Sequence, residues 1–197
     1  MSTTQRPQFT MDVLQWHAWL ETVDETGATP EQAALVAKVA PSPDSRPYYA
    51  LLAHDLPALR ERTALFNAVM YGPGGVRRSD RELASAAASI VNGCVYCTSV
   101  HARRYAQLTR ETEVIQRLLD EGVGTELGER ERAIVDYAVK LTRDPAGMTG
   151  ADLAPLRRVG LSDGEILDVT HATAMFAWAN RLMQTLGEGA PPTGAPA

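Results

Sequence analysis

Apolar residues recur every three or four positions along most of the chain, which is the spacing of one face of an α-helix. Proline, glycine and asparagine separate these segments, and we find no run that alternates between apolar and polar residues as a half-buried strand does. The pattern therefore predicts an all-α fold. The expected helices cover residues 30–39, 48–54, 56–71, 83–91, 94–105, 111–120, 128–142, 152–159 and 162–186.

The two ends of the chain differ from this middle region. Met1 to Gln8 are polar and are expected to be mobile, and the residues that follow carry apolar side chains at helical spacing, which predicts an amphipathic segment. The last eleven residues, Gly187–Ala197, are rich in glycine, proline and alanine and are expected to be disordered. We therefore expect a single helical domain over residues 1–186. The apolar residues of the amphipathic segment are Phe9, Val13, Trp16, Leu20 and Val23.

The amino-acid composition limits the kinds of partner that the protein is expected to bind. The chain has 197 residues, 45% of them hydrophobic, which is enough for one well-packed domain. Its net charge of -5 argues against a nucleic-acid partner, because such proteins concentrate Lys and Arg on one face. No apolar run approaches the roughly 18 residues that a membrane span needs, and the N-terminus shows no hydrophobic signal core. We expect a cytoplasmic protein that binds neither membranes nor nucleic acid.

One stretch, residues 79–104, holds both cysteines of the chain. Ser79 followed three residues later by Glu82 is the signature of a helix N-terminal capping box, and the alanine-rich run after it continues as a helix. Asn92-Gly93 is a strong turn signal, so a second helix is expected to begin at Cys94. The stretch therefore predicts a helical hairpin.

The hairpin brings four reactive side chains together. Cys94, Cys97 and His101 stand at i, i+3 and i+7, so they share one face of the second helix. At a rise of roughly 1.5 Å per residue, Glu82 on the first helix lies within roughly 3 to 5 Å of His101 along the hairpin axis. A carboxylate that orients an imidazole, which in turn takes a proton from a thiol, is an activated nucleophile.

Two cysteines separated by two residues suit redox chemistry. A thiolate can attack a peroxide oxygen to give a sulfenic acid, and a second cysteine at this separation can condense with it to a disulfide. The cycle then needs an external thiol or dithiol reductant, and no cofactor. Which sulfur attacks stays open: Cys94 is favoured by its place at a helix N-terminus and by expected exposure, and Cys97 by its proximity to His101.

Other interpretations of these residues were weighed. Glu82 could be only the N-terminal cap of its helix. Zinc could be held by Cys94, Cys97, His101 and Glu82, although the usual second pair of ligands is missing. Covalent haem attachment is excluded because Thr98, and not histidine, follows the second cysteine. Five residues of the last predicted helix are interpreted as buried groups satisfied by their neighbours, in preference to a pocket lining: Thr170, His171, Phe176, Trp178 and Asn180.

The spacing of Glu82, Cys94, Cys97 and His101 resembles the motif of the AhpD-like alkylhydroperoxidases, a branch of the carboxymuconolactone decarboxylase superfamily. The flanking sequence is similar to that of the uncharacterised peroxidase-related enzymes of that branch. The resemblance covers roughly residues 50–186 and is carried by three further stretches: Phe66–Cys97, Arg130–Pro145 and Leu156–Leu182.

The resemblance implies a helical fold that assembles as dimers, trimers or hexamers, and the activity it implies is thiol-dependent reduction of hydrogen or alkyl peroxides. The residues matching Glu82 and His101 would relay the proton of the cysteine pair. The best-studied relatives carry a second histidine where this chain has Tyr96, which makes Tyr96 a candidate accessory residue. This difference motivates the alternative of a non-catalytic redox sensor or structural oligomeric module. A decarboxylase or isomerase-like activity has little support, because that chemistry does not call for a cysteine pair.

The sequence also contains a short internal repeat. The Ser-Asp-x-Glu sequence at Ser79–Glu82 recurs at Ser162–Glu165, where it also precedes a predicted helix. This is compatible with an internal duplication of a helical unit, of which only one copy carries the cysteines.

Overall fold

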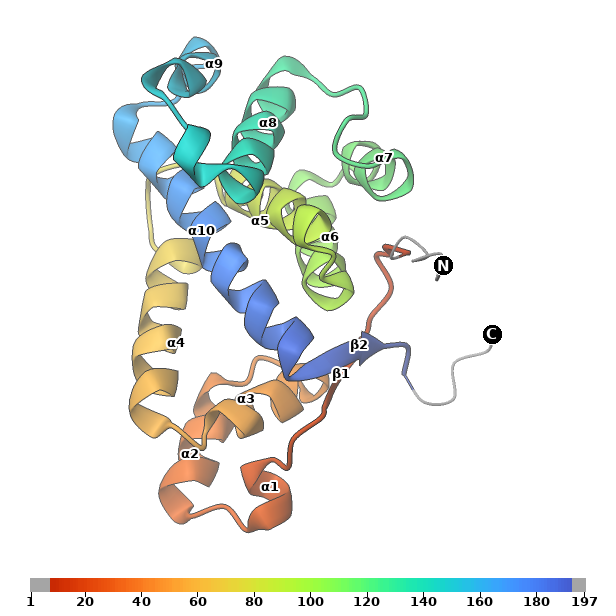
Figure 1. Ribbon diagram of the computed structural model, residues 1–197, viewed down its shortest axis with the longest axis vertical. Coiled ribbons are helices and arrows are strands. Elements are labelled where there is room, and N and C mark those ends of the chain that lie inside the picture. The colour runs from red at the N-terminus through yellow and green to blue at the C-terminus, as the bar shows by residue number, and fades with distance from the viewer. Residues whose placement is uncertain (1–7, 193–197) are drawn as a thin grey trace.

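The computed structural model describes residues 8–192 and contains ten α-helices, three short 3-10 helices and a two-stranded ribbon in that part of the chain (Figure 1). In chain order the elements are β1 (Gln15–Ala18), α1 (Val23–Thr26), α2 (Pro30–Val39), η1 (Pro43–Ser45), α3 (Arg46–Leu52), α4 (Leu56–Tyr71), α5 (Arg78–Asn92), α6 (Val95–Thr109), α7 (Glu113–Glu121), α8 (Glu129–Arg143), η2 (Pro145–Gly147), η3 (Gly150–Leu153), α9 (Ala154–Arg158), α10 (Asp163–Thr185) and β2 (Gly187–Ala190). The prediction of a mainly helical fold is confirmed.

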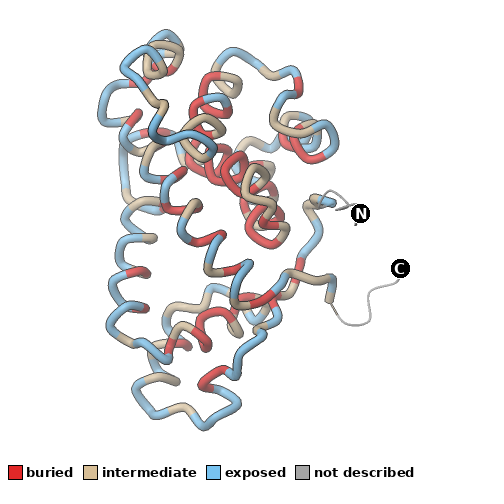
Figure 2. Tube along the Cα trace, viewed as in Figure 1, coloured by how far each residue is buried: buried red, intermediate tan, exposed pale blue. Residues whose placement is uncertain are grey.

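Helix α5 is the centre of the packing. Helices α6, α8 and α10 all contact it, and every residue from Asp80 to Ser89 is buried (Figure 2). Ala84, Ala86, Ala87 and Ala88 have no exposed surface, and such small side chains let neighbouring helices approach closely on all sides. Because α5 is buried on all sides, its C-terminal half has few charged residues.

The predicted turn between α5 and α6 is confirmed. Gly93 has a left-handed backbone with φ of 75°, a conformation that glycine adopts without steric cost. The N–H group of Gly93 donates to the carbonyl of Ile90, and that of Cys94 donates to the carbonyl of Ser89 at 2.9 Å. This pair of bonds is a Schellman motif, so the end of α5 fixes the backbone of Cys94, which caps α6.

The interpretation of Ser79 and Glu82 as a capping box is wrong. Helix α5 begins at Arg78, so Ser79 lies inside the helix and Glu82 is turned into the protein. At Ser162 the box is present, because its hydroxyl accepts from the N–H of Glu165 and the Glu165 carboxylate accepts from the N–H of Ser162. The two sequence repeats thus adopt different local structures, and they give no support to an internal duplication.

The ends of the described chain pair with each other instead of forming a helix and a disordered tail. Residues 15–18 form β1, which runs antiparallel to β2, with Trp16 opposite Gly189. The helical prediction for residues 9–23 is therefore wrong, and so is the expectation of disorder for residues 187–190. Trp16 is 1% exposed and its indole N–H donates to the carbonyl of Met183, which ties the ribbon to α10. The remaining parts of both terminal predictions, residues 1–7 and 193–197, lie outside the described residues.

No helix in the described part of the chain combines the length and the apolar character needed to cross a membrane.

The glycines of β2 are required by close packing. A Cβ atom at Gly187 would overlap the carbonyl oxygen of His17 and the ring of Trp16, and one at Gly189 would lie 2.8 Å from the Cβ of Tyr96. The strand therefore lies directly on the first turn of α6, which carries the cysteines.

We predict that Gly187→Ala lowers the free energy of unfolding by roughly 1–3 kcal/mol, because overpacking forces the ribbon and Trp16 apart. The matched control is Gly164→Ala in the first turn of α10, where a Cβ would meet nothing within 4 Å. It should leave the protein as stable or stabilise it by up to about 1 kcal/mol. Urea unfolding followed by circular dichroism measures both, and equal stabilities for the two variants would contradict the packing described for β2.

Candidate active site

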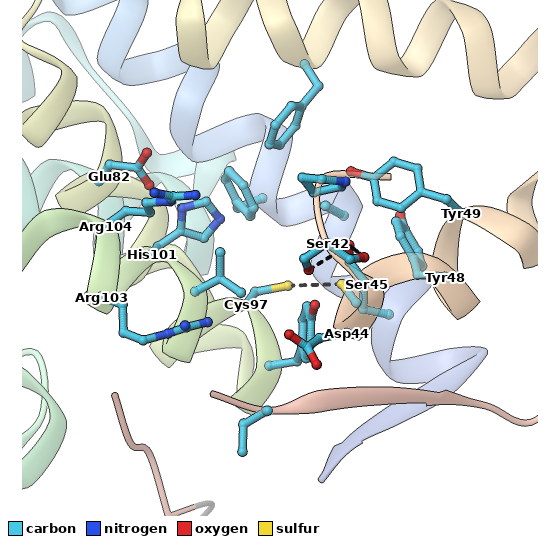
Figure 3. A pocket seen from close by; sticks show the side chains of 18 of the residues that line it. Ser42, Asp44, Ser45, Tyr48, Tyr49, Glu82, Cys97, His101, Arg103 and Arg104 are labelled. Atoms are coloured by element: carbon cyan, nitrogen blue, oxygen red, sulfur yellow. Dashed lines mark hydrogen bonds and ion pairs between the residues drawn. The ribbon is translucent and has the colours of Figure 1, made fainter. Parts of the chain in front are cut away.

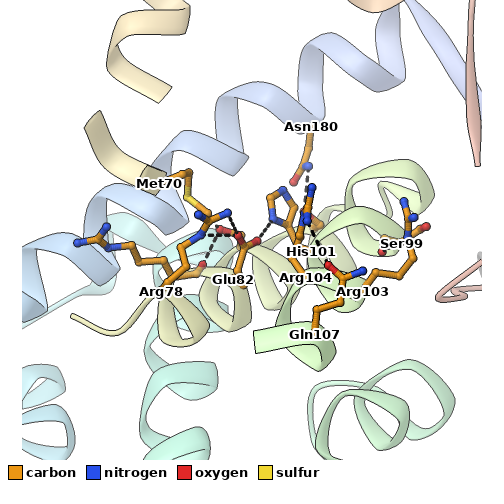
Figure 4. Close-up of polar contacts among 12 residues, drawn as sticks. Met70, Arg78, Glu82, Ser99, His101, Arg103, Arg104, Gln107 and Asn180 are labelled. Atoms are coloured by element: carbon orange, nitrogen blue, oxygen red, sulfur yellow. Dashed lines mark hydrogen bonds and ion pairs between the residues drawn. The ribbon is translucent and has the colours of Figure 1, made fainter. Parts of the chain in front are cut away.

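Glu82 lies at the centre of a buried charge cluster. It is 1% exposed, and its Oε2 atom lies 2.5 Å from the Nδ1 atom of His101 (Figure 4). Arg78, one turn earlier on α5, donates from Nε to the Oε1 atom at 2.7 Å. Burial opposes ionisation of this carboxyl, yet the interactions with His101 and Arg78 outweigh burial and hold the pKa of Glu82 below its ordinary value. The predicted contact between Glu82 and His101 is thus present in the structure.

His101 is held on two sides. The carboxylate of Glu82 fixes Nδ1, and the ring of Phe176 on α10 packs edge-on against the imidazole with 4.0 Å between ring centroids. With Nδ1 engaged, Nε2 is the nitrogen left to exchange a proton with another group. The two contacts therefore fix the orientation of the imidazole.

The two cysteines lie at the start of α6 and are both free thiols. Cys94 is 2% exposed, which corrects the expectation that it is exposed at the helix N-terminus. The Cys97 thiol and backbone N–H group beside the Cys94 sulfur lower the pKa of Cys94, against the opposing effect of burial. The pKa of Cys97 is raised by the Cys94 side chain and by burial. Cys94 is therefore the more acidic thiol of the pair.

Asn180 of α10 links the cysteine pair to the turn of the hairpin. It has no exposed surface, donates to the hydroxyl of Ser89 at 3.1 Å and accepts from the side chain of Asn92 at 3.0 Å. Its amide also lowers the pKa of both cysteines by hydrogen bonding. The sequence interpretation of Asn180 as a buried, satisfied group is correct, but its contact with the sulfurs was missed.

A cavity of about 290 Å³ opens onto this cluster. Cys97, His101 and Glu82 line it together with Tyr96, whereas Cys94 does not. Figure 3 shows Cys97 and His101 on one wall of the cavity and Tyr48 and Tyr49 on the facing wall. The four predicted site residues are therefore brought together, but only one of the two sulfurs faces the space that a small molecule can enter.

Tyr96 stands where the resemblance expects a second histidine. Burial raises the pKa of its phenol, so the hydroxyl stays protonated at neutral pH. A protonated phenol cannot act as a base, so Tyr96 does not replace the second histidine in that role.

Sequence reasoning missed most of the far wall. Tyr48 and Tyr49 come from α3, Arg62 and Phe66 from α4, and Phe176 and Met183 from α10. Among the five residues of α10 considered from the sequence, Phe176 lines the cavity, contrary to the interpretation made, Thr170 pairs with the hydroxyl of Tyr137, and His171 and Trp178 are exposed. No local motif marks these wall residues, because they meet only when distant helices pack.

Metal ligation is not supported by this geometry. Within residues 8–192, no three His, Cys, Asp or Glu side chains converge closely enough to hold a metal ion. The zinc site weighed from the sequence therefore lacks the required cluster.

The comparisons with known proteins agree with this fold. The model of the carboxymuconolactone decarboxylase family matches residues 57–140. An uncharacterized peroxidase-related protein from Silicibacter sp. TM1040 is 25% identical, with a TM-score of 0.67 over 94% of this chain and 93% of that chain. A second uncharacterized peroxidase-related protein, described as an alkylhydroperoxidase AhpD core, comes from Ralstonia eutropha JMP134. It is 23% identical, with a TM-score of 0.69 over 89% of this chain and 90% of that chain.

A protein named for a different reaction shares the fold. The debrominase Bmp8 is 15% identical, with a TM-score of 0.64 over 89% of this chain and 91% of that chain. None of the curated proteins compared with the chain matches it. Residues 57–140 of the chain thus resemble the carboxymuconolactone decarboxylase family. The chain has the all-helical fold of the AhpD-like proteins to which it is similar.

We predict that Glu82→Gln lowers the free energy of unfolding by on the order of 3 kcal/mol at pH 7, because it leaves Arg78 and His101 without their buried carboxylate. The folded-state pKa of Glu82 lies below its ordinary value of 4.5, so its stabilisation is fully present above pH 4.5 and is lost as the pH falls through the folded-state value. The difference between variant and parent should therefore shrink below pH 4.5.

The matched control is Glu113→Gln, which removes one partner of an exposed pair with Arg117 and should leave stability nearly unchanged. Urea titrations between pH 3 and pH 8 provide the measurement. A Glu82→Gln variant as stable as the parent at pH 7 would show that the buried cluster does not stabilise the fold.

Proposed function

We propose that the protein is a thiol-dependent peroxidase that reduces hydrogen peroxide or organic hydroperoxides through Cys97 and Cys94. The observation that carries the proposal is the cavity in which the Cys97 thiol and the Glu82-His101 pair meet. Similarity to the AhpD-like proteins supports a peroxidase-related activity, and the debrominase that shares the fold cautions that fold alone does not fix the reaction.

Cys97 is the attacking residue in this proposal, because it faces the cavity and stands one helical turn from His101. His101 accepts the Cys97 proton, and the thiolate attacks a peroxide oxygen. The O–O bond breaks, a sulfenic acid forms on Cys97, and the departing alkoxide takes the proton from His101 and leaves as an alcohol.

Cys94 then closes the cycle. Its lowered pKa makes it the more acidic thiol of the pair, and its place beside Cys97 allows its thiolate to attack the sulfenic sulfur. A disulfide forms, and the hydroxide released takes a proton from solvent to give water. In sum, two thiols and one hydroperoxide give one disulfide, one alcohol and one water. An external thiol or dithiol, such as a reducing cytoplasm supplies, restores the pair.

Two further properties belong to the proposal. We expect the protein to act as a homo-oligomer, as the resemblance implies. A non-catalytic redox sensor is the competing function, and the burial of both sulfurs favours it, since buried thiols react slowly with oxidants. The two functions differ in turnover: a sensor oxidises once, whereas a peroxidase consumes peroxide for as long as a dithiol reductant is supplied.

The variants Cys97→Ser and Cys94→Ser test the proposal and the order of attack. The parent should lose two thiols per chain on addition of one equivalent of peroxide and should sustain peroxide consumption with dithiothreitol. Cys97→Ser should react no faster than background. In the absence of dithiothreitol, Cys94→Ser should consume one equivalent and stop at a sulfenic acid that dimedone traps, as mass spectrometry would show. The opposite pattern would make Cys94 the attacking residue, and consumption of more than one equivalent by either variant without dithiothreitol would exclude the two-cysteine cycle.

A further inference from the structure

The cavity contains a buried positive charge that the proposed peroxidase chemistry does not use. Arg62 of α4 is 8% exposed and lines the same cavity as Cys97. No carboxylate of the described residues lies within 4.0 Å of its guanidinium. A charged group is rarely buried in this way without a partner, because removing it from water costs several kcal/mol.

The contacts that Arg62 does make leave its hydrogen-bonding capacity largely unused. Its Nη1 atom donates to the hydroxyl of Tyr49 at 3.2 Å, and the guanidinium stacks near the rings of Tyr48, Tyr49 and Phe66, with 4.6 Å to the centroid of Phe66. The Nε atom of Arg62 and the hydroxyl of Tyr48 are buried and have no hydrogen-bond partner. A buried guanidinium with an unpaired donor suits an anionic ligand.

The other charges around the cavity also favour an anion. Arg103 and Arg104 lie on its wall, and Glu82 is already balanced by Arg78 and His101. Asp44 is the remaining carboxylate on the wall. The lining therefore carries an excess of positive charge, and the planar, donor-rich guanidinium of Arg62 suits a carboxylate better than it suits a neutral group.

Position and shape define the ligand further. Tyr49, which Arg62 contacts, stands on the wall opposite Cys97 and His101 (Figure 3). The cavity volume of about 290 Å³ is small for a ligand site, and Phe66, Phe176 and Tyr71 give it aromatic walls. A fitting molecule has an anionic group at one end, a short apolar or aromatic body, and its reactive group at the other end.

We propose that Arg62, assisted by the hydroxyl of Tyr48, binds the carboxylate of the substrate, so that the preferred substrate is a small organic hydroperoxide that also carries a carboxylate. The choice of a hydroperoxide rests on the proposed function, whereas the carboxylate site does not depend on it. Binding at Arg62 directs the opposite end of the molecule to Cys97, so Arg62 sets specificity and takes no part in breaking the O–O bond.

A binding experiment tests the carboxylate site without any turnover. We expect the parent to bind 4-isopropylbenzoate roughly tenfold or more tightly than the uncharged 4-isopropylbenzamide in calorimetric titrations, and salt to weaken the difference. Arg62→Gln should abolish the preference, and Arg62→Lys should retain part of it. The matched control is Arg60→Gln on the same helix, which pairs with Glu31 on the surface and should bind both ligands as the parent does. Equal affinities of the parent for the acid and the amide would overturn the proposal.

Thermal unfolding separates a binding role from a structural one. If Arg62 serves a ligand, its burial without a partner is a cost in the free protein, so Arg62→Gln should unfold at the same or a higher temperature than the parent and should lose the stabilisation by 4-isopropylbenzoate. A lower unfolding temperature combined with an unchanged response to the acid would show that the guanidinium only supports the aromatic wall.

Kinetics then connect the site to the reaction. The ratio of kcat/KM for cumene hydroperoxide carrying a para-carboxylate to kcat/KM for unsubstituted cumene hydroperoxide, and to that for hydrogen peroxide, should fall tenfold or more in Arg62→Gln, whereas Arg60→Gln should keep the ratios of the parent. Similar losses for all three substrates would overturn the specificity role. If the parent reduces none of the three but binds the acid selectively, the peroxidase proposal fails and the carboxylate site stands.

Discussion

The contact between Glu82 and His101 is the constraint on which the geometry of the site depends. It joins α5 to α6 across the hairpin, in the protein interior, and Arg78 supplies the positive charge that lets the carboxylate remain ionised there. A buried carboxylate is tolerated only when its hydrogen bonds are satisfied, so the contact admits little variation in the register of the two helices. The Schellman turn at Gly93 sets the same register from the other end of the hairpin. Together they fix where the sulfurs stand relative to the imidazole.

Helix α10 completes the site from the far end of the sequence. Its residues Phe176, Asn180 and Met183 lie one turn apart on a single face, and they contact the imidazole, the hairpin turn and the Cys97 sulfur, the last at 3.4 Å. The strand that follows α10 folds back on Tyr96, with no room for a side chain at Gly189. A displacement of α10 would therefore disturb the base, the thiols and the cavity at once, which explains why this long helix is anchored again by the indole of Trp16.

The division between what could and could not be predicted follows the range of the interactions. The helical hairpin, its turn at Asn92-Gly93 and the meeting of Glu82 with His101 depend on separations of a few residues to a few turns, which spacing alone determines. The cap assigned to Ser79 failed because α5 begins at Arg78, which puts Ser79 inside the helix and leaves the Glu82 carboxylate to pair with His101 and Arg78. The ribbon of β1 and β2 was not predicted, because a glycine-rich strand has no apolar alternation. Such a strand gains its structure only from a partner more than 160 residues away. The aromatic wall of the cavity and the position of Arg62 in it could not be predicted for the same reason.

The two sulfurs differ in a way that assigns them different chemical roles. Cys97, which lines the cavity, has the raised pKa. Cys94, which does not line the cavity, has the lowered pKa. If acidity alone decided reactivity, peroxide would have to reach Cys94 through the protein. In the proposed cycle access decides instead, because a sulfur that a peroxide cannot approach cannot attack it, and His101 is the base proposed for Cys97. Once Cys97 is oxidised, Cys94 attacks its sulfur, and the lowered pKa of Cys94 favours its thiolate for that step. The asymmetry of the pair thus fits the order of attack proposed for the two sulfurs.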